Sequence, residues 1–286
     1  MHVWLDSTAD GIDLLQQVPE WVEEIEQALS RFRPESELSR LNHQIGSWVR
    51  VSPPMFDVIL QAKHAARSTG GLYTPLILGA LIASGYDRSF DLMAGYAAET
   101  TSEDALIANW HDMQIDIHSR RVWLPGEIDL GGIAKGWTAQ WIANRLSDYG
   151  ACMVDAGGDI VTRGKYEWDV IIADPFSSEP IASVQIRDAA VATSGTDYRR
   201  WLQGDRLQHH LIDPRTAQSA VTDVISATVI HPDGPTAEAY AKALVVLGAQ
   251  PGLEWLQHQW DGTGLVVQQD RAVLMTPTME NYLRRI

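Results

Sequence analysis

The segment from Ile128 to Gly136, Ile-Asp-Leu-Gly-Gly-Ile-Ala-Lys-Gly, constrains the fold more than any other part of the chain. Its glycine pair allows a tight turn directly after an apolar lead-in and a carboxylate. Apolar residues then recur at helical spacing up to Leu146, which predicts an amphipathic helix. A helix N-terminus offers unpaired N–H groups and Lys135 adds a full charge, so the segment is a candidate phosphate site. The same pattern is compatible with a plain loop in which Asp129 is a cap and Lys135 is solvated.

Composition and charge exclude several classes of protein. The chain has 286 residues, of which 45% are hydrophobic and 21% are charged, as in an ordinary globular protein. A net charge of -15 argues against a nucleic-acid or anionic-membrane partner. The single cysteine, Cys152, lies in an apolar run, which predicts a buried thiol. No apolar run is long enough to span a membrane, and the first residues do not resemble a signal peptide. We therefore expect a cytoplasmic protein, or an exported or membrane-anchored one if a leader has been removed.

Helix and strand signals alternate along the chain without a repeat or a linker. Pro19 is expected to begin a helix that runs to Phe32, Pro53 another that closes at Gly70, and Thr236 a third that stops at Gly248. Residues 115–117 and 122–124 are expected to form a hairpin, and residues 190–195 a strand that breaks into a Thr-Ser-Gly turn. Residues 94–108 are Ala-rich, acidic and expected to be peripheral. The chain is thus expected to be one α+β unit over residues 1–286, with two lobes.

Two polar segments carry most of the remaining chemistry. Residues 31–42 hold so many hydroxyls and charges that they form either a capped short helix or a binding loop. Residues 209–216, His-His-Leu-Ile-Asp-Pro-Arg-Thr, gather two imidazoles, a carboxylate, a guanidinium and a hydroxyl. Metal-ligand spacings, a nucleophile elbow, a Rossmann fingerprint and a phosphate-loop motif are all missing. The glycine turns, the Thr-Ser-Gly segment, Lys135 and residues 209–216 suit a ligand with phosphates and a flat ring. His210 would act on that ligand as general acid or base.

The order of these blocks resembles the FAD:protein FMN transferase family, the ApbE-like proteins. The resemblance runs from about residue 30 to about residue 250, and six blocks in the right order make it specific. The matching blocks are Ser36 to Asn42, Gly71 to Pro75, Asp129 to Gly136, Gly157 to Asp159, Ala192 to Gly195 and His209 to Thr216, followed by the pair Glu238 and Lys242.

The resemblance implies a fold, a reaction and a set of site residues. The fold would be ApbE-like and T-fold-like, with mixed or antiparallel sheets, flanking helices and a flavin site between two lobes. FAD would be cut at its pyrophosphate and FMN passed to a Ser or Thr hydroxyl of an acceptor protein, with Mg²⁺ assisting and AMP leaving. His210 and Lys242 would be catalytic, and the Gly132 carbonyl and Glu238 would hold the metal. FAD contacts would come from Tyr73, Leu106, Ile107, Ala108, Asp129, Lys135, Ser194 and Ile212.

Departures from the family pattern keep alternatives open. The family places Asp and Thr where this chain has Glu238 and Lys242, and protonated lysine cannot ligate a cation. Three interpretations follow. The charge of Lys242 replaces that of the ion, or the metal is bound by fewer protein ligands, or Lys242 and Glu238 form only an i,i+4 salt bridge. Thr74, Leu76 and Ala217 also depart from the pattern, and a Met-Gly-Thr near the N-terminus is missing. An FAD pyrophosphatase and a catalytically degenerate FAD-binding protein are the alternatives. The sequence alone does not show whether His209 or His210 takes the proton, and His210 is preferred because it lies three residues before Asp213, as in the family pattern.

Overall fold

The computed structural model describes residues 1–7, 9–93, 106–177, 179–259 and 262–284. The chain forms two compact units, each assembled from segments that are distant in sequence. Unit 1 comprises Met1–Glu23, Ala134–Gly195 and Thr222–Ile286, and unit 2 comprises Glu24–Ile133 and Thr196–Val221. The architecture is α+β, as predicted. Most of the segment expected to be peripheral, residues 94–105, lies outside the described residues.

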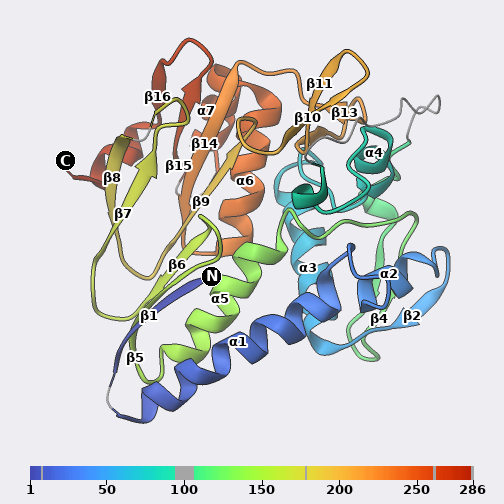
Figure 1. The fold of residues 1–286 in the computed structure, drawn as a ribbon, viewed down its shortest axis with the longest axis horizontal. Coiled ribbons are helices and arrows are strands. Elements are labelled where there is room, and N and C mark those ends of the chain that lie inside the picture. The colour runs from blue at the N-terminus through green and yellow to red at the C-terminus, as the bar shows by residue number, and fades with distance from the viewer. Residues whose placement is uncertain (8, 94–105, 178, 260–261, 285–286) are drawn as a thin grey trace. The chain divides into compact units, whose positions relative to one another are not determined.

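Unit 1 is built on a seven-stranded antiparallel sheet (Figure 1). In spatial order its strands are β1 (His2–Ser7), β5 (Gly150–Asp155), β6 (Ile160–Arg163), β9 (Ala190–Gly195), β14 (Val224–His231), β15 (Thr263–Gln268) and β16 (Val273–Met275). Helix α5 (Ala134–Leu146) packs on β5 and β6, helix α6 (Gly234–Leu247) packs on β9 and β14, and α7 (Ala249–Gln257) packs on β15. A smaller antiparallel sheet has the order β17 (Leu283–Arg284), β8 (Pro180–Ile186) and β7 (Trp168–Ala173).

The central strands of unit 1 are buried on both faces. In β14 every side chain from Ser226 to Ile230 is buried, without the alternation that a half-exposed strand shows. Ile230 packs in one apolar cluster with Val184 of β8 and Val267 of β15, while α6 packs along β14. These two covers explain why the side chains of β14 are buried on both faces, including the polar Ser226 and Thr228.

Unit 2 contains short helices and small antiparallel sheets. Its helices are α2 (Glu37–Asn42), α3 (Pro53–Ser68) and α4 (Leu78–Ala83), with 3₁₀ turns η1 (Phe90–Leu92) and η2 (Trp110–Asp112). Its strands pair as β2 (Trp48–Arg50), β4 (Arg121–Trp123) and β3 (Gln114–Asp116) in one sheet, β10 (Arg200–Gln203) with β11 (Arg206–His209), and β12 (Ile212–Asp213) with β13 (Gln218–Ser219). The hairpin expected between residues 115 and 124 is confirmed as β3 and β4, which β2 joins as a third strand.

Two local predictions are wrong. Helix α1 (Ala9–Leu29) begins ten residues before Pro19, which lies inside the helix. Pro19 is exposed, so water can satisfy the Leu15 carbonyl that loses its helical donor. Residues 193–195 do not form a turn either. Thr193 and Ser194 continue β9 and pair with Thr228 and Ala227 of β14, because the ladder satisfies their backbone groups.

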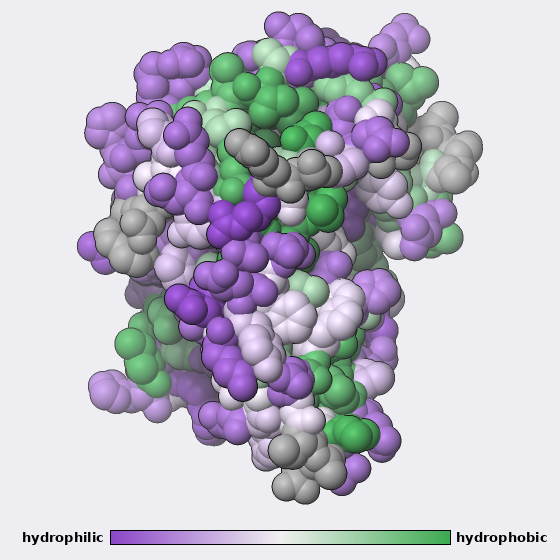
Figure 2. Space-filling model, turned by 90° about the vertical axis from the view of Figure 1, so that its left-hand side faces the viewer, coloured by the Kyte–Doolittle hydropathy of each residue, from purple (hydrophilic) through white to green (hydrophobic). Residues whose placement is uncertain are grey.

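The surface mixes polar and apolar side chains. Figure 2 shows one face on which hydrophilic residues predominate and hydrophobic residues gather in separate patches, mainly toward its upper end. No helix among the described residues is long and apolar enough to cross a membrane.

Cys152 lies in the core of unit 1, as predicted. Its side chain is fully buried in β5, and its thiol donates to the Ala143 carbonyl over 3.3 Å. Burial raises the pKa of the Cys152 thiol to about 11. Since the thiolate is the reactive form, we expect iodoacetamide at about pH 8 to alkylate the native protein at least about 100-fold more slowly than an ordinary thiol. Mass spectrometry with and without denaturant measures this, and fast native labelling would contradict the buried position.

Candidate functional site

Helices α5 and α6 approach each other through two glycines at their N-terminal ends. A Cβ atom added to Gly136 would lie 2.8 Å from the Gly234 carbonyl oxygen, closer than side chains tolerate. The Gly136 N–H donates to Glu238 Oε2 over 2.9 Å. Asp233 caps α6 and Pro235 lies in its first turn, so the helix begins at Gly234, two residues before the predicted start at Thr236. The close crossing fixes where the Glu238 carboxylate lies.

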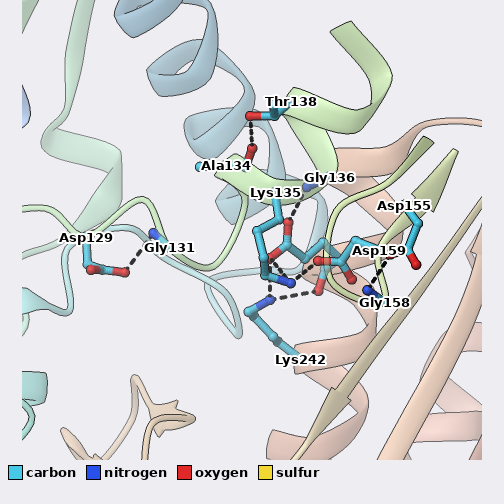
Figure 3. Close-up of polar contacts among 11 residues, drawn as sticks. Asp129, Gly131, Ala134, Lys135, Gly136, Thr138, Asp155, Gly158, Asp159 and Lys242 are labelled. Carbon is cyan, nitrogen blue, oxygen red and sulfur yellow. Dashed lines mark hydrogen bonds and ion pairs between the residues drawn. The ribbon is translucent and has the colours of Figure 1, made fainter. Parts of the chain in front are cut away.

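Two lysines and a second carboxylate join Glu238 in a partly buried cluster, of which Figure 3 labels Lys135, Asp159 and Lys242. We call Lys135, Asp159, Glu238 and Lys242 the charge cluster. Lys242 Nζ lies 3.1 Å from Glu238 Oε1, and Lys135 Nζ lies 3.8 Å from the same oxygen. Lys135 also pairs with Asp159 Oδ2. The exposed fractions of the Asp159 and Glu238 side chains are 3% and 1%, against 36% for Lys135 and 16% for Lys242.

Burial and the lysines shift the two carboxyl groups in opposite directions. Burial raises the pKa of Asp159 to about 6, although Lys135 limits the increase. Burial alone would also raise the pKa of Glu238, but the two lysines and the Gly136 N–H outweigh it and hold that pKa below its ordinary value. At neutral pH Glu238 is an anion and Asp159 is mostly ionised, so the charge cluster holds two cations and two anions.

Glu238 and Lys242 do not fit the magnesium site that the resemblance implies. The oxygen of Glu238 that faces the cluster already contacts an ammonium group, and its other oxygen accepts the Gly136 N–H. An ion bound to Glu238 Oε1 would compete with Lys242 Nζ for the same oxygen, and the two like charges would repel each other. Among the described residues, no group of three or more His, Cys, Asp or Glu side chains is arranged to hold a metal ion.

In unit 2, the polar run of residues 31–42 holds the segment that carries Asp129. Arg31 Nε lies 2.8 Å from Asp129 Oδ2, and the side chains of both residues are largely buried. Asp129 Oδ1 accepts the Gly131 N–H over 2.9 Å, so the carboxylate also shapes the glycine turn. Asn42 exchanges two hydrogen bonds with the backbone of Ile128, at 2.9 and 3.0 Å. Of the two alternatives for this run, the structure has the capped short helix, α2, with Ser36 as its N-cap.

The two histidines of the His-His pair have different surroundings. His209 Nδ1 accepts the Leu211 N–H over 3.3 Å, and its Nε2 lies 3.0 Å from the Ala220 carbonyl. Those contacts require a neutral ring that donates from Nε2. Burial lowers the pKa of His209, which favours the same neutral form. These contacts give His209 a structural role in unit 2, whereas His210 is half-buried.

The residues expected to contact FAD differ in exposure and lie on several different elements. Ile107 packs against an apolar cluster that contains Trp201 and Ile212, so two of these residues share one cluster in unit 2. Tyr73 is buried, with 4% of its surface exposed, whereas Leu106 is 94% exposed. Other expected contacts lie in the coil before η2 (Ala108), in the glycine turn (Asp129), in β9 (Ser194) and in the first turn of α5 (Lys135), and Gly132, the expected metal ligand, lies in the same glycine turn.

Sequence reasoning assigned no role to three residues that hold these sites. Asp159 was part of a matching block, but its pairing with Lys135 joins residues 24 positions apart. Arg31 and Asn42 lie in the polar run, and their partners are Asp129 and Ile128, which follow far along the chain. A buried polar side chain needs a partner, and only Asn42, which follows Leu41 in α2, stands beside an apolar helix position.

The fold is that of the flavin transferases whose structures resemble it. The ApbE protein from Thermotoga maritima superposes with a TM-score of 0.80 at 24% identity, over 99% of this chain and 94% of that one. Flavin transferase ApbE from Vibrio cholerae superposes with a TM-score of 0.79 at 23% identity, over 98% of this chain and 93% of that one.

Sequence comparison identifies the family. The chain belongs to the ApbE family, whose model matches residues 1–267. A protein from Treponema pallidum named FAD:protein FMN transferase is 30% identical over 91% of this chain and 78% of its own length. One of the same name from Klebsiella pneumoniae is 29% identical over 92% of this chain and 84% of its own length. The resemblance read from the motif order is confirmed.

Proposed function

We propose that this protein is an FAD:protein FMN transferase, which splits FAD and attaches FMN to a hydroxyl of an acceptor protein. The observation that carries the proposal is the family match over residues 1–267, since the relatives that match across most of this chain have that name. The named activity implies FAD as substrate and a protein as acceptor. A Ser or Thr side chain is the acceptor group that we propose.

The reaction is a phosphoryl substitution. The acceptor oxygen forms a bond to the FMN phosphorus, the bond from that phosphorus to the bridging oxygen breaks, and AMP leaves with the bonding electron pair. We assign the acceptor proton to His210, because both ring nitrogens of His209 are engaged with backbone groups. Negative charge on the pyrophosphate needs positive charge nearby, and Lys135 at the start of α5 has the exposure to supply it.

The remaining site assignments belong to the same proposal. Tyr73 and Ile212 would contact the flavin, residues 106–108 the adenosine side, and Asp129 and Ser194 other parts of FAD. Support for the apolar contacts comes from the cluster that Ile107 shares with Ile212. The Gly132 carbonyl would be the remaining metal ligand that the resemblance implies, and the reaction proposed here does not use it. The reaction described above includes no step through Mg²⁺, because the contacts of Glu238 do not suit one.

A labelling experiment tests the function. The protein is incubated with FAD and a library of peptides that each carry one Ser or Thr, with and without Mg²⁺, and the products are analysed by mass spectrometry. We expect a peptide to gain one FMN less one water, with an equal amount of AMP. Matched peptides with Ala at the acceptor position should gain nothing. Free FMN and AMP without labelled peptide would indicate a pyrophosphatase, and intact FAD throughout would indicate a binding protein.

A further inference from the structure

We propose that Lys242, together with Lys135, supplies the positive charge that a divalent cation would otherwise supply, so that FMN transfer by this protein does not require a metal ion at Glu238. The inference rests on the proposed function. It starts from the contact of 3.1 Å between Lys242 Nζ and Glu238 Oε1, one turn apart on α6. Glu238 is anchored from its other oxygen by the Gly136 N–H, so the carboxylate that positions Lys242 is itself fixed.

The formal charge of the cluster supports this assignment. Lys135 and Lys242 contribute two positive charges, and Asp159 and Glu238 contribute two negative charges, so the sum is zero. A neutral cluster has no excess negative charge with which to recruit a cation. Replacing Lys242 by Thr would leave a net charge of about -1 and put a hydroxyl oxygen in its place, which is a donor set that Mg²⁺ accepts.

The exposure of the two lysines leaves them available to a substrate. The Lys135 side chain is 36% exposed and that of Lys242 is 16% exposed, while the carboxylate side chains are 3% and 1% exposed. When substrate binds, phosphate oxygens can replace part of the carboxylate contacts of these ammonium groups. The buried carboxylates hold the lysines in place before substrate binds, and such preorganised charge is what phosphoryl transfer needs.

Two measurements on the wild-type protein and its variants test the proposal. The first is the rate of FMN transfer in EDTA against the rate in Mg²⁺. The second is binding of Mn²⁺, followed by electron paramagnetic resonance, which does not depend on activity. For the wild-type protein we expect rates within about twofold of each other and no Mn²⁺ binding. For Lys242→Thr we expect a loss of about 10²–10³-fold in EDTA, recovery with Mg²⁺, and a new Mn²⁺ site.

Further variants separate charge from folding. Lys242→Arg keeps the charge and should keep transfer in EDTA, whereas Lys165→Thr, an exposed lysine in the loop after β6, should change neither measurement. Loss of wild-type transfer in EDTA that Mg²⁺ restores would overturn the proposal, as would Mn²⁺ binding by the wild-type cluster. If no condition gives FMN transfer or FAD cleavage, the proposed function fails, and the Mn²⁺ comparison still decides whether Lys242 occupies a cation site.

Discussion

Replacing His210 by Asn is expected to slow FMN transfer by about 10²–10⁴-fold, the usual contribution of a general base. The amide cannot accept the acceptor proton, although it preserves much of the shape of the ring. His210 is half-buried, so the folded protein should tolerate the change. The rate of peptide labelling under saturating FAD measures the effect, and circular dichroism checks the fold.

His209 provides the matched control, because it is the adjacent residue with the same side chain. His209→Ala leaves the Leu211 N–H and the Ala220 carbonyl without their partner, which should destabilise the protein by about 1–3 kcal/mol. The rate per folded molecule should change much less than in His210→Asn. A His210→Asn protein that transfers FMN within tenfold of the wild-type rate would show that another group takes the proton.

The elements that could be predicted best from the sequence are those whose ends are defined by local chemistry. Helix α3 begins after the Ser52 cap with Pro53 in its first turn, and α6 ends at Gly248, which has a positive φ. These signals act within one turn of helix, so they can be read without knowing the fold. The same logic misplaced the start of α1, because an exposed proline inside a helix loses only one hydrogen bond.

Contacts between distant residues could not be predicted in the same way. Arg31 and Asp129 pair across 98 positions, and Asn42 holds Ile128 across 86. Nothing in the local pattern selects one carboxylate for Arg31 among the 37 acidic residues of the chain. The tertiary fold makes that choice when it buries both groups together. The sequence could therefore identify these residues as polar and unusual, but it could not name their partners.

For the candidate site, the motif order predicted more than residue chemistry did. The resemblance marked Lys135, Glu238 and Lys242 as neighbours of one ligand, and the structure joins them in the charge cluster. Residue chemistry alone also allows an isolated i,i+4 salt bridge between Glu238 and Lys242. That pair is present, but burial of Glu238 and its bond from Gly136 make it part of a larger arrangement.

Replacing Arg31 by Met is expected to lower the free energy of unfolding by about 3–5 kcal/mol, because it leaves the Asp129 carboxylate buried without its partner. The Arg31 side chain is 6% exposed and that of Asp129 is 11% exposed, so water cannot readily take over the lost interaction. The guanidinium also lies 4.1 Å from the Phe32 ring and 4.6 Å from the Tyr86 ring, and Met keeps some of that packing but none of the charge. Urea denaturation followed by tryptophan fluorescence measures the change.

Arg33→Met is the matched control for Arg31→Met, since Arg33 lies two residues away and pairs with Glu26 on the surface. The side chains of that pair are 35% and 55% exposed, so its loss should change the free energy of unfolding by less than about 1 kcal/mol. Adding Asp129→Asn to Arg31→Met should restore part of the stability, because a neutral amide costs less to bury than an unpaired carboxylate. Equal effects of Arg31→Met and Arg33→Met, or no recovery in the double variant, would show that the Arg31 contact does not stabilise the turn before α5. If the contact does hold that turn, Arg31→Met should also raise the KM for FAD, a change that Arg33→Met should not produce.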